Sequence, residues 1–457
     1  MAEIKYYPLT PPQEMIGVML KYSFFHKQVV QIPTSIVTTR VIDFDLMKKA
    51  INIEIERNDS MRLRFTKKKG KTLQYFIPEY KLTDIPVMEF KTKEEQESTL
   101  EADACKAVKF LKGETFRIIL FKSYDGKYGI YSNISHFVMD AAAGFIFYAD
   151  LFSVYDALEK GTEMPRPMGS YEKVIGKELA YINNAEKVKK DEDAYREFFL
   201  KDGEPIYNGA HGSAKLDALQ QKNPDARQIG IFDPIHDKCL LQKLPVSAED
   251  SKAILDYITE AGVSPECLVQ LGMRLHIANI NHRRMDSFFM SLCTRRRTLE
   301  EKHCGGSVTA SLPWRIVMDE KWTFTEALAQ LQDLQGWIFR HANYPFTAWR
   351  DLEAGLYNYS KTAGSTTMMF SWLPLEPDSL NGWDYEFTGY SMGRYCLPLY
   401  SYAMKASDGN SLKFAYLHRP NYISVENIED MHNQTIKALN IGCKNPELTL
   451  GEIMDRL

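Results

Sequence analysis

The feature that most constrains this chain is a strand that ends directly before a histidine. Residues 128–135 are predicted to form the strand, His136 follows it at once, and Asp140 comes four residues later. Apolar residues then recur at helical spacing: Phe145, Ile146, Tyr148, Ala149, Leu151, Phe152, Tyr155 and Leu158. A histidine at the end of a buried strand can point its imidazole into a cleft while its backbone stays rigid. We therefore expect the rest of the chain to be a scaffold around His136.

The remainder of the chain alternates between predicted strands and helices in both halves. Strands are predicted over 29–41, 61–65, 72–77, 115–122, 240–244, 287–293, 307–316, 366–373, 389–401 and 412–417, and long helices over 264–278, 327–342 and 424–440. Residues 162–235 differ, with prolines, charge clusters and a polar loop that are typical of a connecting segment. The pattern predicts an α+β fold with an N-terminal unit over 1–185, a helical linker over 186–235 and a similar unit over 236–457.

Composition excludes several classes of protein. A length of 457 residues suggests two to four domains at ~150 residues each. The net charge of −4 and the lack of a basic stripe interleaved with aromatics argue against nucleic-acid binding. Seven dispersed cysteines, none in Cys-x-x-Cys spacing, indicate free thiols in a reducing compartment. No signal peptide, no membrane span and no metal-ligand spacing are recognised, so we expect a cytoplasmic protein.

The stretch Ser135–Ala141 resembles the HHxxxDG motif of the chloramphenicol acetyltransferase-like superfamily. This superfamily includes the condensation domains of nonribosomal peptide synthetases and related alcohol acyltransferases. A His-x-x-x-Asp match alone is weak, but other stretches are similar to condensation-domain motifs in the right order along the chain: Leu9–Glu14, Arg57–Phe65, Ser264–Ala278, Thr294–Arg297, Gly305-Gly306 and Ser311–Arg315. The resemblance therefore covers almost the whole chain.

The resemblance implies a fold and a function. The fold is two acetyltransferase-like subdomains in a V-shaped pseudo-dimer, with a tunnel at their junction that reaches His136. The function is that of a stand-alone acyltransferase, which moves an acyl group from a CoA or carrier-protein thioester to a hydroxyl or amine. Asp140 would be structural and would pair with Arg57. No tightly bound cofactor is implied, since acyl-CoA or a phosphopantetheinyl carrier thioester is the co-substrate.

The chemistry of acyl transfer gives these residues their roles. A general base with a pKa near the working pH must accept a proton from the acceptor, and His136 is the candidate. Hydrogen-bond donors must stabilise the oxyanion, and the candidates are Ser135, the amide near Ala141, and Ser371. Ser135 and Ala141 stand where the motif usually has His and Gly. An alanine would fit poorly if the turn at 141 needed a positive φ.

Simpler interpretations compete with this one. His136 could be a hydrogen-bonded core histidine, and the chain could be a catalytically degenerate binding or scaffold protein, which Ser135 and Ala141 favour. A hydrolase lacks support because no Gly-x-Ser-x-Gly elbow occurs. His276 is expected in the core and His211 in solvent. The aromatic residues between 372 and 402 fit either a core or a pocket.

Overall fold

The structure is a computed structural model that describes residues 4–23, 25–358, 360, 363–373 and 380–457. The chain forms two compact units. Unit 1 consists of Met1–Asn184, Thr294–Thr309 and Leu375–Arg394, and unit 2 consists of Ala185–Cys293, Ala310–Pro374 and Tyr395–Leu457. The predicted α+β class is confirmed, whereas the V-shaped arrangement and its tunnel stay predictions.

The two units are not continuous in sequence, unlike the three consecutive segments that were predicted. The expected linker over 186–235 lies within unit 2, where Tyr195 and Phe199 are fully buried and the Tyr195 ring packs on Tyr344 and Trp337. Two later segments belong to unit 1 instead. Long-range packing decided this division, and local composition carries no signal for such packing.

Unit 1 is built on a five-stranded sheet. Its strands, in spatial order, are β14 (Glu386–Gly389), β2 (Gln31–Thr38), β7 (Tyr128–Ser135), β6 (Phe116–Lys122) and β5 (Val87–Glu89). The pairings are antiparallel except for the parallel pair β5–β6. The central strand β7 is buried from Gly129 to Ser135. Its end is therefore a rigid platform for the residue that follows.

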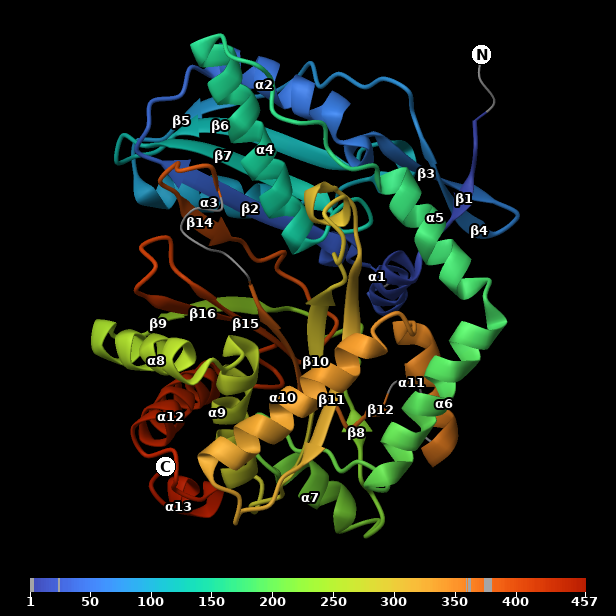
Figure 1. Ribbon diagram of the computed structural model, residues 1–457, viewed down its shortest axis with the longest axis vertical. Coiled ribbons are helices and arrows are strands. Elements are labelled where there is room, and N and C mark those ends of the chain that lie inside the picture. The colour runs from blue at the N-terminus through green and yellow to red at the C-terminus, as the bar shows by residue number, and fades with distance from the viewer. Residues whose placement is uncertain (1–3, 24, 359, 361–362, 374–379) are drawn as a thin grey trace. The chain divides into compact units, whose positions relative to one another are not determined.

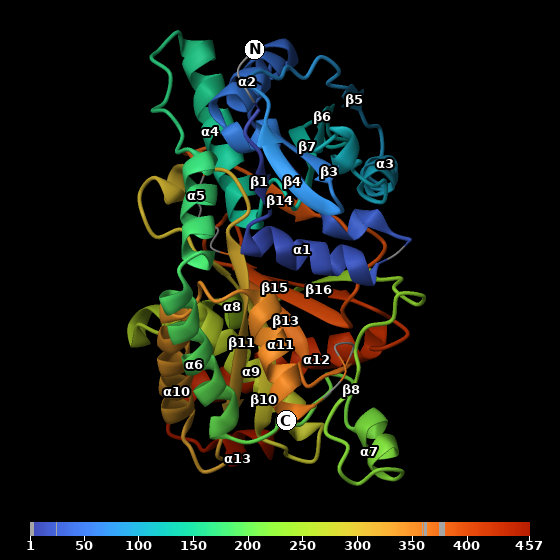
Figure 2. The ribbon, with the colours of Figure 1, turned by 90° about the vertical axis from the view of Figure 1, so that its right-hand side faces the viewer.

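Helices cover both faces of this sheet. The helices of unit 1 are α1 (Pro11–Tyr22), α2 (Phe44–Arg57), α3 (Lys93–Ala104), α4 (Ala141–Lys160) and α5 (Tyr171–Ile182). Helices α2 and α4 lie over one face (Figure 1), and α3 lies on the other (Figure 2). Asp140 caps α4 by accepting from the Ala143 amide at 2.8 Å. The strand–loop–helix order predicted around His136 is confirmed.

A smaller sheet completes unit 1. The hairpin of β3 (Leu63–Lys68) and β4 (Lys71–Phe76) turns at Lys69-Gly70, where both residues have a positive φ. The short strand β1 (Tyr7–Pro8) adds to its edge. Short 3-10 helices connect these elements: Lys27–Val30, Asp59–Arg62 and Phe110–Lys112.

Unit 2 is built on a six-stranded sheet. Its strands, in spatial order, are β11 (Thr309–Val317), β10 (Asp286–Thr294), β13 (Met368–Trp372), β15 (Leu399–Lys405), β16 (Leu412–His418) and β9 (Leu240–Pro245). A separate pair joins β8 (Ile229–Gly230) to β12 (Ala363–Gly364). The strand predicted over 389–401 is wrong, because β14 ends at Gly389 and β15 starts only at Leu399.

The helices of unit 2 enclose a large apolar core. They are α6 (Ala185–Lys201), α7 (Ala214–Gln220), α8 (Ala248–Ala261), α9 (Pro265–Asn279), α10 (Phe324–Arg340), α11 (Phe346–Tyr357), α12 (Val425–Lys444) and α13 (Leu450–Met454). Helix α9 is buried from Cys267 to Ala278, so His276 lies in the core as expected. His211 is not solvent-facing as expected, since it is partly buried against the Tyr422 ring and lies 3.3 Å from the Tyr207 hydroxyl.

Helix α4 is long and apolar enough to cross a membrane. An 18-residue window has a mean hydropathy of 1.3, and 44% of that window is buried within the fold. Phe147, Leu151 and Phe152 are fully buried in unit 1. A core helix has the same composition, so this property is weak evidence for a membrane span.

Candidate active site around His136

His136 lies in a tight turn between β7 and α4. Its amide donates to the Val30 carbonyl at 2.8 Å. The Ser135 carbonyl accepts from the amides of Val138 at 2.8 Å and Met139 at 3.3 Å, which closes the turn. Ser135, Val138 and Met139 are buried, while His136 is only partly buried. The backbone is therefore fixed while the side chain keeps access to its surroundings.

The imidazole of His136 has no hydrogen-bond partner among the described residues. Its Nδ1 is buried and unpaired in the described part of the chain. Burial lowers the pKa of His136 below its ordinary value of 6.5, and the Asp140 carboxylate and nearby backbone groups oppose this only in part. The lowered pKa favours the neutral ring at pH 7, and the tautomer with its proton on Nδ1 has Nε2 available to accept a proton.

Asp140 is the centre of a buried ion pair. Its Oδ2 accepts from Arg296 Nη1 at 2.9 Å, from the Val308 amide at 2.8 Å and from the Thr309 amide at 3.1 Å. The Asp140 side chain is 1% exposed and that of Arg296 is 4% exposed. Burial alone would raise the pKa of Asp140, but the Arg296 charge and the amides of Val308 and Ala143 outweigh it and hold that pKa below 3.8. Asp140 is therefore a charged structural anchor.

The predicted pairing of Asp140 with Arg57 is wrong. Arg57 at the end of α2 makes two hydrogen bonds to Asp150, from Nε at 2.8 Å and from Nη2 at 2.9 Å. Asp150 lies ten residues after Asp140, which is ~15 Å along a helix. The correct partner, Arg296, lies within the Thr294–Arg297 stretch that matched a condensation-domain motif. The motif match gave it no role because only the folded chain brings it to Asp140.

The segment Thr294–Thr309 reaches the His136 loop through its backbone. Met139 bridges to Gly306, and Arg296 Nη2 donates to the Gly306 carbonyl at 2.9 Å. Gly306 has a φ of +90°, and a Cβ there would lie 2.0 Å from the Tyr171 ring. Only glycine fits this position. The segment and the loop thus form one connected unit around Asp140.

A small cavity lies beside the start of α4. It has a volume of about 40 Å³ and is lined by Ile32, Thr34, Ser132, Ile134, Met139, Asp140, Ala141, Gly144, Phe145, Tyr148 and Phe387. The lining is mostly apolar, but three hydroxyls meet in its wall. Tyr148 Oη lies 2.8 Å from Ser132 Oγ and 3.4 Å from Thr34 Oγ1. A Cβ at Gly144 would meet no atom within 4 Å.

The candidate oxyanion donors lie in two different units. Ser135 and Ala141 belong to the His136 loop in unit 1. The Ser135 hydroxyl is buried without a partner among the described residues. Ala141 is the first residue of α4 and its φ lies outside the left-handed region, so alanine causes no strain there. Ser371 belongs to β13 of unit 2, where its hydroxyl accepts from Tyr400 Oη at 3.2 Å.

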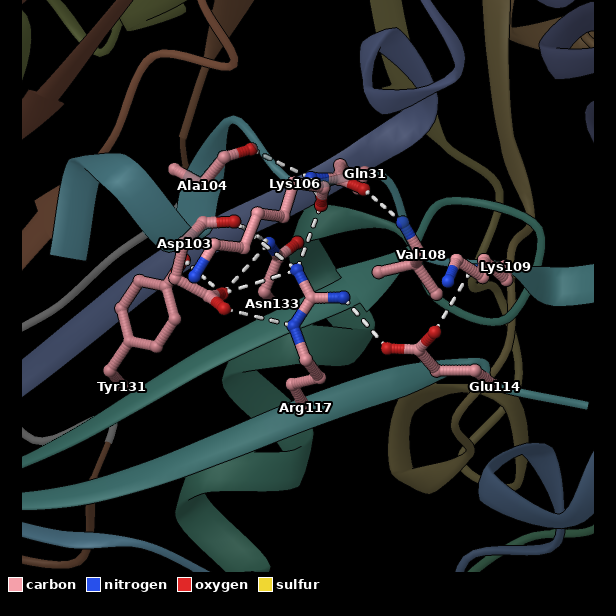
Figure 3. A network of polar contacts seen from close by, with 10 residues as sticks. All are labelled: Gln31, Asp103, Ala104, Lys106, Val108, Lys109, Glu114, Arg117, Tyr131 and Asn133. Atoms are coloured by element: carbon pink, nitrogen blue, oxygen red, sulfur yellow. Dashed lines mark hydrogen bonds and ion pairs between the residues drawn. The ribbon is translucent and has the colours of Figure 1, made fainter. Parts of the chain in front are cut away.

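A polar network supports β7 on the face opposite α4 (Figure 3). Asp103 at the end of α3 accepts hydrogen bonds from Tyr131 at 3.0 Å, Asn133 at 3.2 Å and Arg117 at 3.0 Å. The Gln31 amide group donates to the Ala104 carbonyl at 2.7 Å. This network fixes β7 immediately before His136. Within the described part of the chain, no group of three or more His, Cys, Asp or Glu side chains could hold a metal ion.

Comparison with solved structures identifies the fold. The first condensation domain of the calcium-dependent antibiotic synthetase, in complex with a substrate analogue, superimposes with a TM-score of 0.80. It is 15% identical, and the match covers 98% of each chain. The chain has the condensation-domain fold. A variant of the starter condensation domain of rhizomide synthetase RzmA, in complex with C8-CoA, has a TM-score of 0.77 at 16% identity and covers 98% of this chain and 97% of that one.

Sequence comparisons agree with this condensation-type fold. The condensation domain family model matches residues 3–205. One subunit of the plipastatin synthase of Bacillus subtilis (strain 168) is 20% identical over 90% of this chain, and surfactin synthase subunit 1 of the same organism is 23% identical over 99%. The chain spans only 15% and 12% of these two relatives. The resemblance predicted from the motifs is confirmed.

Proposed function

We propose that this condensation-type chain transfers an acyl group from a CoA or carrier-protein thioester to a hydroxyl or amine. The observation that carries the proposal is the geometry of His136, whose Nδ1 has no partner among the described residues and whose backbone is fixed at the end of β7. The lowered pKa of the imidazole favours its neutral, proton-accepting form. The resemblance to a domain that binds C8-CoA supports a thioester as the donor. The donor and the acceptor are therefore defined only as chemical classes.

The proposed reaction uses His136 twice. The acceptor gives its proton to Nε2 as its oxygen or nitrogen attacks the thioester carbonyl, and a C–O or C–N bond forms. The tetrahedral intermediate then collapses with cleavage of the C–S bond, and the imidazolium gives the proton to the leaving thiolate, which is released as the thiol. The Ser135 hydroxyl and the Ala141 amide, both on the His136 loop, are the proposed oxyanion donors in unit 1, and Ser371 stays a candidate in unit 2.

The test is thiol release from acyl-CoA thioesters and from acyl-pantetheine thioesters, each offered with a panel of alcohols and amines. Acceptor-dependent turnover supports the proposal. If no combination gives turnover above a heat-inactivated sample, the proposal is wrong.

The pH dependence of this activity is predicted from the state of His136. Only the neutral imidazole can accept a proton, and burial lowers the pKa of His136 below 6.5. The rate constant kcat/KM is thus expected to be level at pH 7–8 and to fall about tenfold per pH unit below the lowered pKa. Initial rates between pH 5 and 8 measure this. A midpoint at or above pH 7 would contradict the lowered pKa.

The cavity at the start of α4 is the proposed site for acyl carbons beyond the acetyl methyl. Replacing Gly144 with Leu is expected to fill the cavity, since a Cβ there has free space around it and the cavity holds only about 40 Å³. We expect a ten- to hundredfold loss of kcat/KM for octanoyl relative to acetyl donors, which is ~1.4–2.7 kcal/mol. Gly17→Leu in α1, where a Cβ also meets nothing within 4 Å, is the matched control. An equal loss for both donors would exclude this role.

A second candidate function is a catalytically degenerate binding or scaffold protein. The unpaired Nδ1 of His136 favours it, because no side chain fixes the tautomer of the ring. Ser135 and Ala141, which stand where the motif usually has His and Gly, also favour a catalytically degenerate protein. Under this alternative, His136→Ala would leave the cellular phenotype intact and no thioester would be consumed.

A further inference from the structure

A pair of buried glutamines holds the loop that carries His136. Gln13 lies in the first turn of α1 and Gln74 lies in β4, and both are 0% exposed. Gln13 Nε2 donates to Gln74 Oε1 at 2.7 Å, and Gln74 Nε2 donates to Gln13 Oε1 at 2.7 Å. The two amides thus form a reciprocal pair that fixes the orientation of each.

The glutamine pair uses its remaining hydrogen-bond capacity at its two ends. Gln74 Nε2 also donates to the Pro8 carbonyl at 2.8 Å. Gln13 Oε1 accepts from the Thr10 amide at 2.9 Å and from the Thr10 hydroxyl at 3.1 Å. The second proton of Gln13 Nε2 goes to the Phe137 carbonyl at 2.9 Å. All four N–H bonds of the two amides are used.

The contact with Phe137 is important because no described side chain forms a hydrogen bond that orients the His136 ring. The imidazole lacks a hydrogen-bond partner among the described residues, so its direction depends on its backbone. That backbone is held before the ring by the bond from the His136 amide to the Val30 carbonyl. On the C-terminal side of His136 the backbone is held by the amides of Val138 and Met139, which donate to the Ser135 carbonyl, and by the bond from Gln13 to the Phe137 carbonyl. The bond from Gln13 is the one among these that a side chain supplies.

We infer that Gln13 is a positioning residue for His136, acting through the Phe137 carbonyl. The inference rests on the proposed function of His136 as the general base. Without Gln13, the peptide plane between Phe137 and Val138 loses the donor to its carbonyl, and only its Val138 amide stays bonded, to the Ser135 carbonyl at 2.8 Å. The turn that carries His136 is then held less firmly. A displacement of a catalytic group by ~1 Å can cost ~100-fold in rate. Gln74 holds Gln13 but does not touch the loop.

The experiment compares Gln13→Met with Gln74→Met. Both variants replace one buried amide by a side chain of similar length, and both break the reciprocal pair. Only Gln13→Met removes the donor to Phe137. The Phe137 ring stays anchored by stacking on Phe110 at 4.6 Å and by its edge contact with Phe65 at 5.5 Å, so both variants are expected to fold. The two should lose similar amounts of thermal stability.

The kinetic arm measures kcat and KM separately. Gln13→Met is expected to lower kcat by ~10- to 100-fold with KM changed less than threefold, and Gln74→Met to lower kcat by less than fivefold. Gln13→Asn, which keeps the amide one carbon shorter, should be intermediate and also serves if Gln13→Met fails to fold. Equal kcat values for Gln13→Met and Gln74→Met would overturn the inference.

The second arm does not depend on activity. The ¹³C-labelled histidine ring signals are followed between pH 5 and 8 by NMR, and the His136 signal is assigned by its loss in His136→Ala. In Gln13→Met its titration is expected to move up toward the value of an exposed imidazole, ~6.5, and in Gln74→Met to stay close to that of the unchanged protein. An unaltered titration in Gln13→Met overturns the inference. Absent turnover in the unchanged protein would reject only the proposed function.

Discussion

Replacing His136 with Ala is expected to reduce thiol release from an acyl thioester by ~10²- to 10⁴-fold, the usual contribution of a positioned general base. The effect should fall on kcat, since the imidazole acts on the proton that moves in the transition state. Thermal stability should change little, because the ring is partly exposed and makes no hydrogen bond within the described residues. Initial rates and a melting curve on the same samples measure both quantities.

The control for this variant is His236→Ala. His236 is exposed in unit 2 and bonds only to Asp233 among the described residues, so its loss should leave the rate within twofold. An acyltransferase that keeps more than a tenth of its rate without His136 would have another base. In that case Nε2 of His136 would not be the catalytic base.

Replacing Asp140 with Ala is expected to lower the free energy of unfolding by ~3–5 kcal/mol, the usual cost of breaking a buried ion pair from one side. The variant leaves the Arg296 guanidinium buried without its charge partner. It also removes the acceptor of the Val308 and Thr309 amides and the cap of α4 at the Ala143 amide. Urea denaturation followed by circular dichroism measures the change.

Arg57 provides the matched comparison for this prediction. Arg57→Ala breaks the contact with Asp150 and should leave the Asp140 anchor intact. In a double-mutant cycle, Asp140 and Arg296 should therefore couple by more than 1 kcal/mol, whereas Asp140 and Arg57 should be additive within ~0.5 kcal/mol. Strong coupling between Asp140 and Arg57 would contradict the pairing in the structure and restore the one expected from the motif.

The ion pair of Asp140 and Arg296 also determines how the stabilising effect of Asp140 depends on pH. The pKa of Asp140 is lower in the folded chain than its ordinary value of 3.8. A carboxyl with a lowered folded pKa stabilises the fold fully above its unfolded pKa, and this stabilisation is lost as the pH falls through the folded pKa. Asp140 therefore contributes its full share above about pH 5, which covers the pH range of the activity tests.

Local sequence signals were sufficient to predict the strand, turn and helix around His136. A buried strand, a polar turn and an apolar helix each follow from short-range periodicity, and the order 128–135, His136, α4 is confirmed. The strands predicted over 61–65 and 72–77 likewise correspond to the paired strands β3 and β4. Motif order then predicted the condensation-domain fold, which the structural comparisons confirm.

Only the tertiary structure decided which distant residues meet at this unit. Asp140 could pair with any buried cation, and the choice of Arg296 over Arg57 depends on the return of Thr294–Thr309 to unit 1. The same holds for Gln13, which meets Gln74 and Phe137 across 61 and 124 residues. Periodicity predicts only on which face of its own helix or strand a residue lies. The partners are set by packing between elements, and a single sequence does not record that packing.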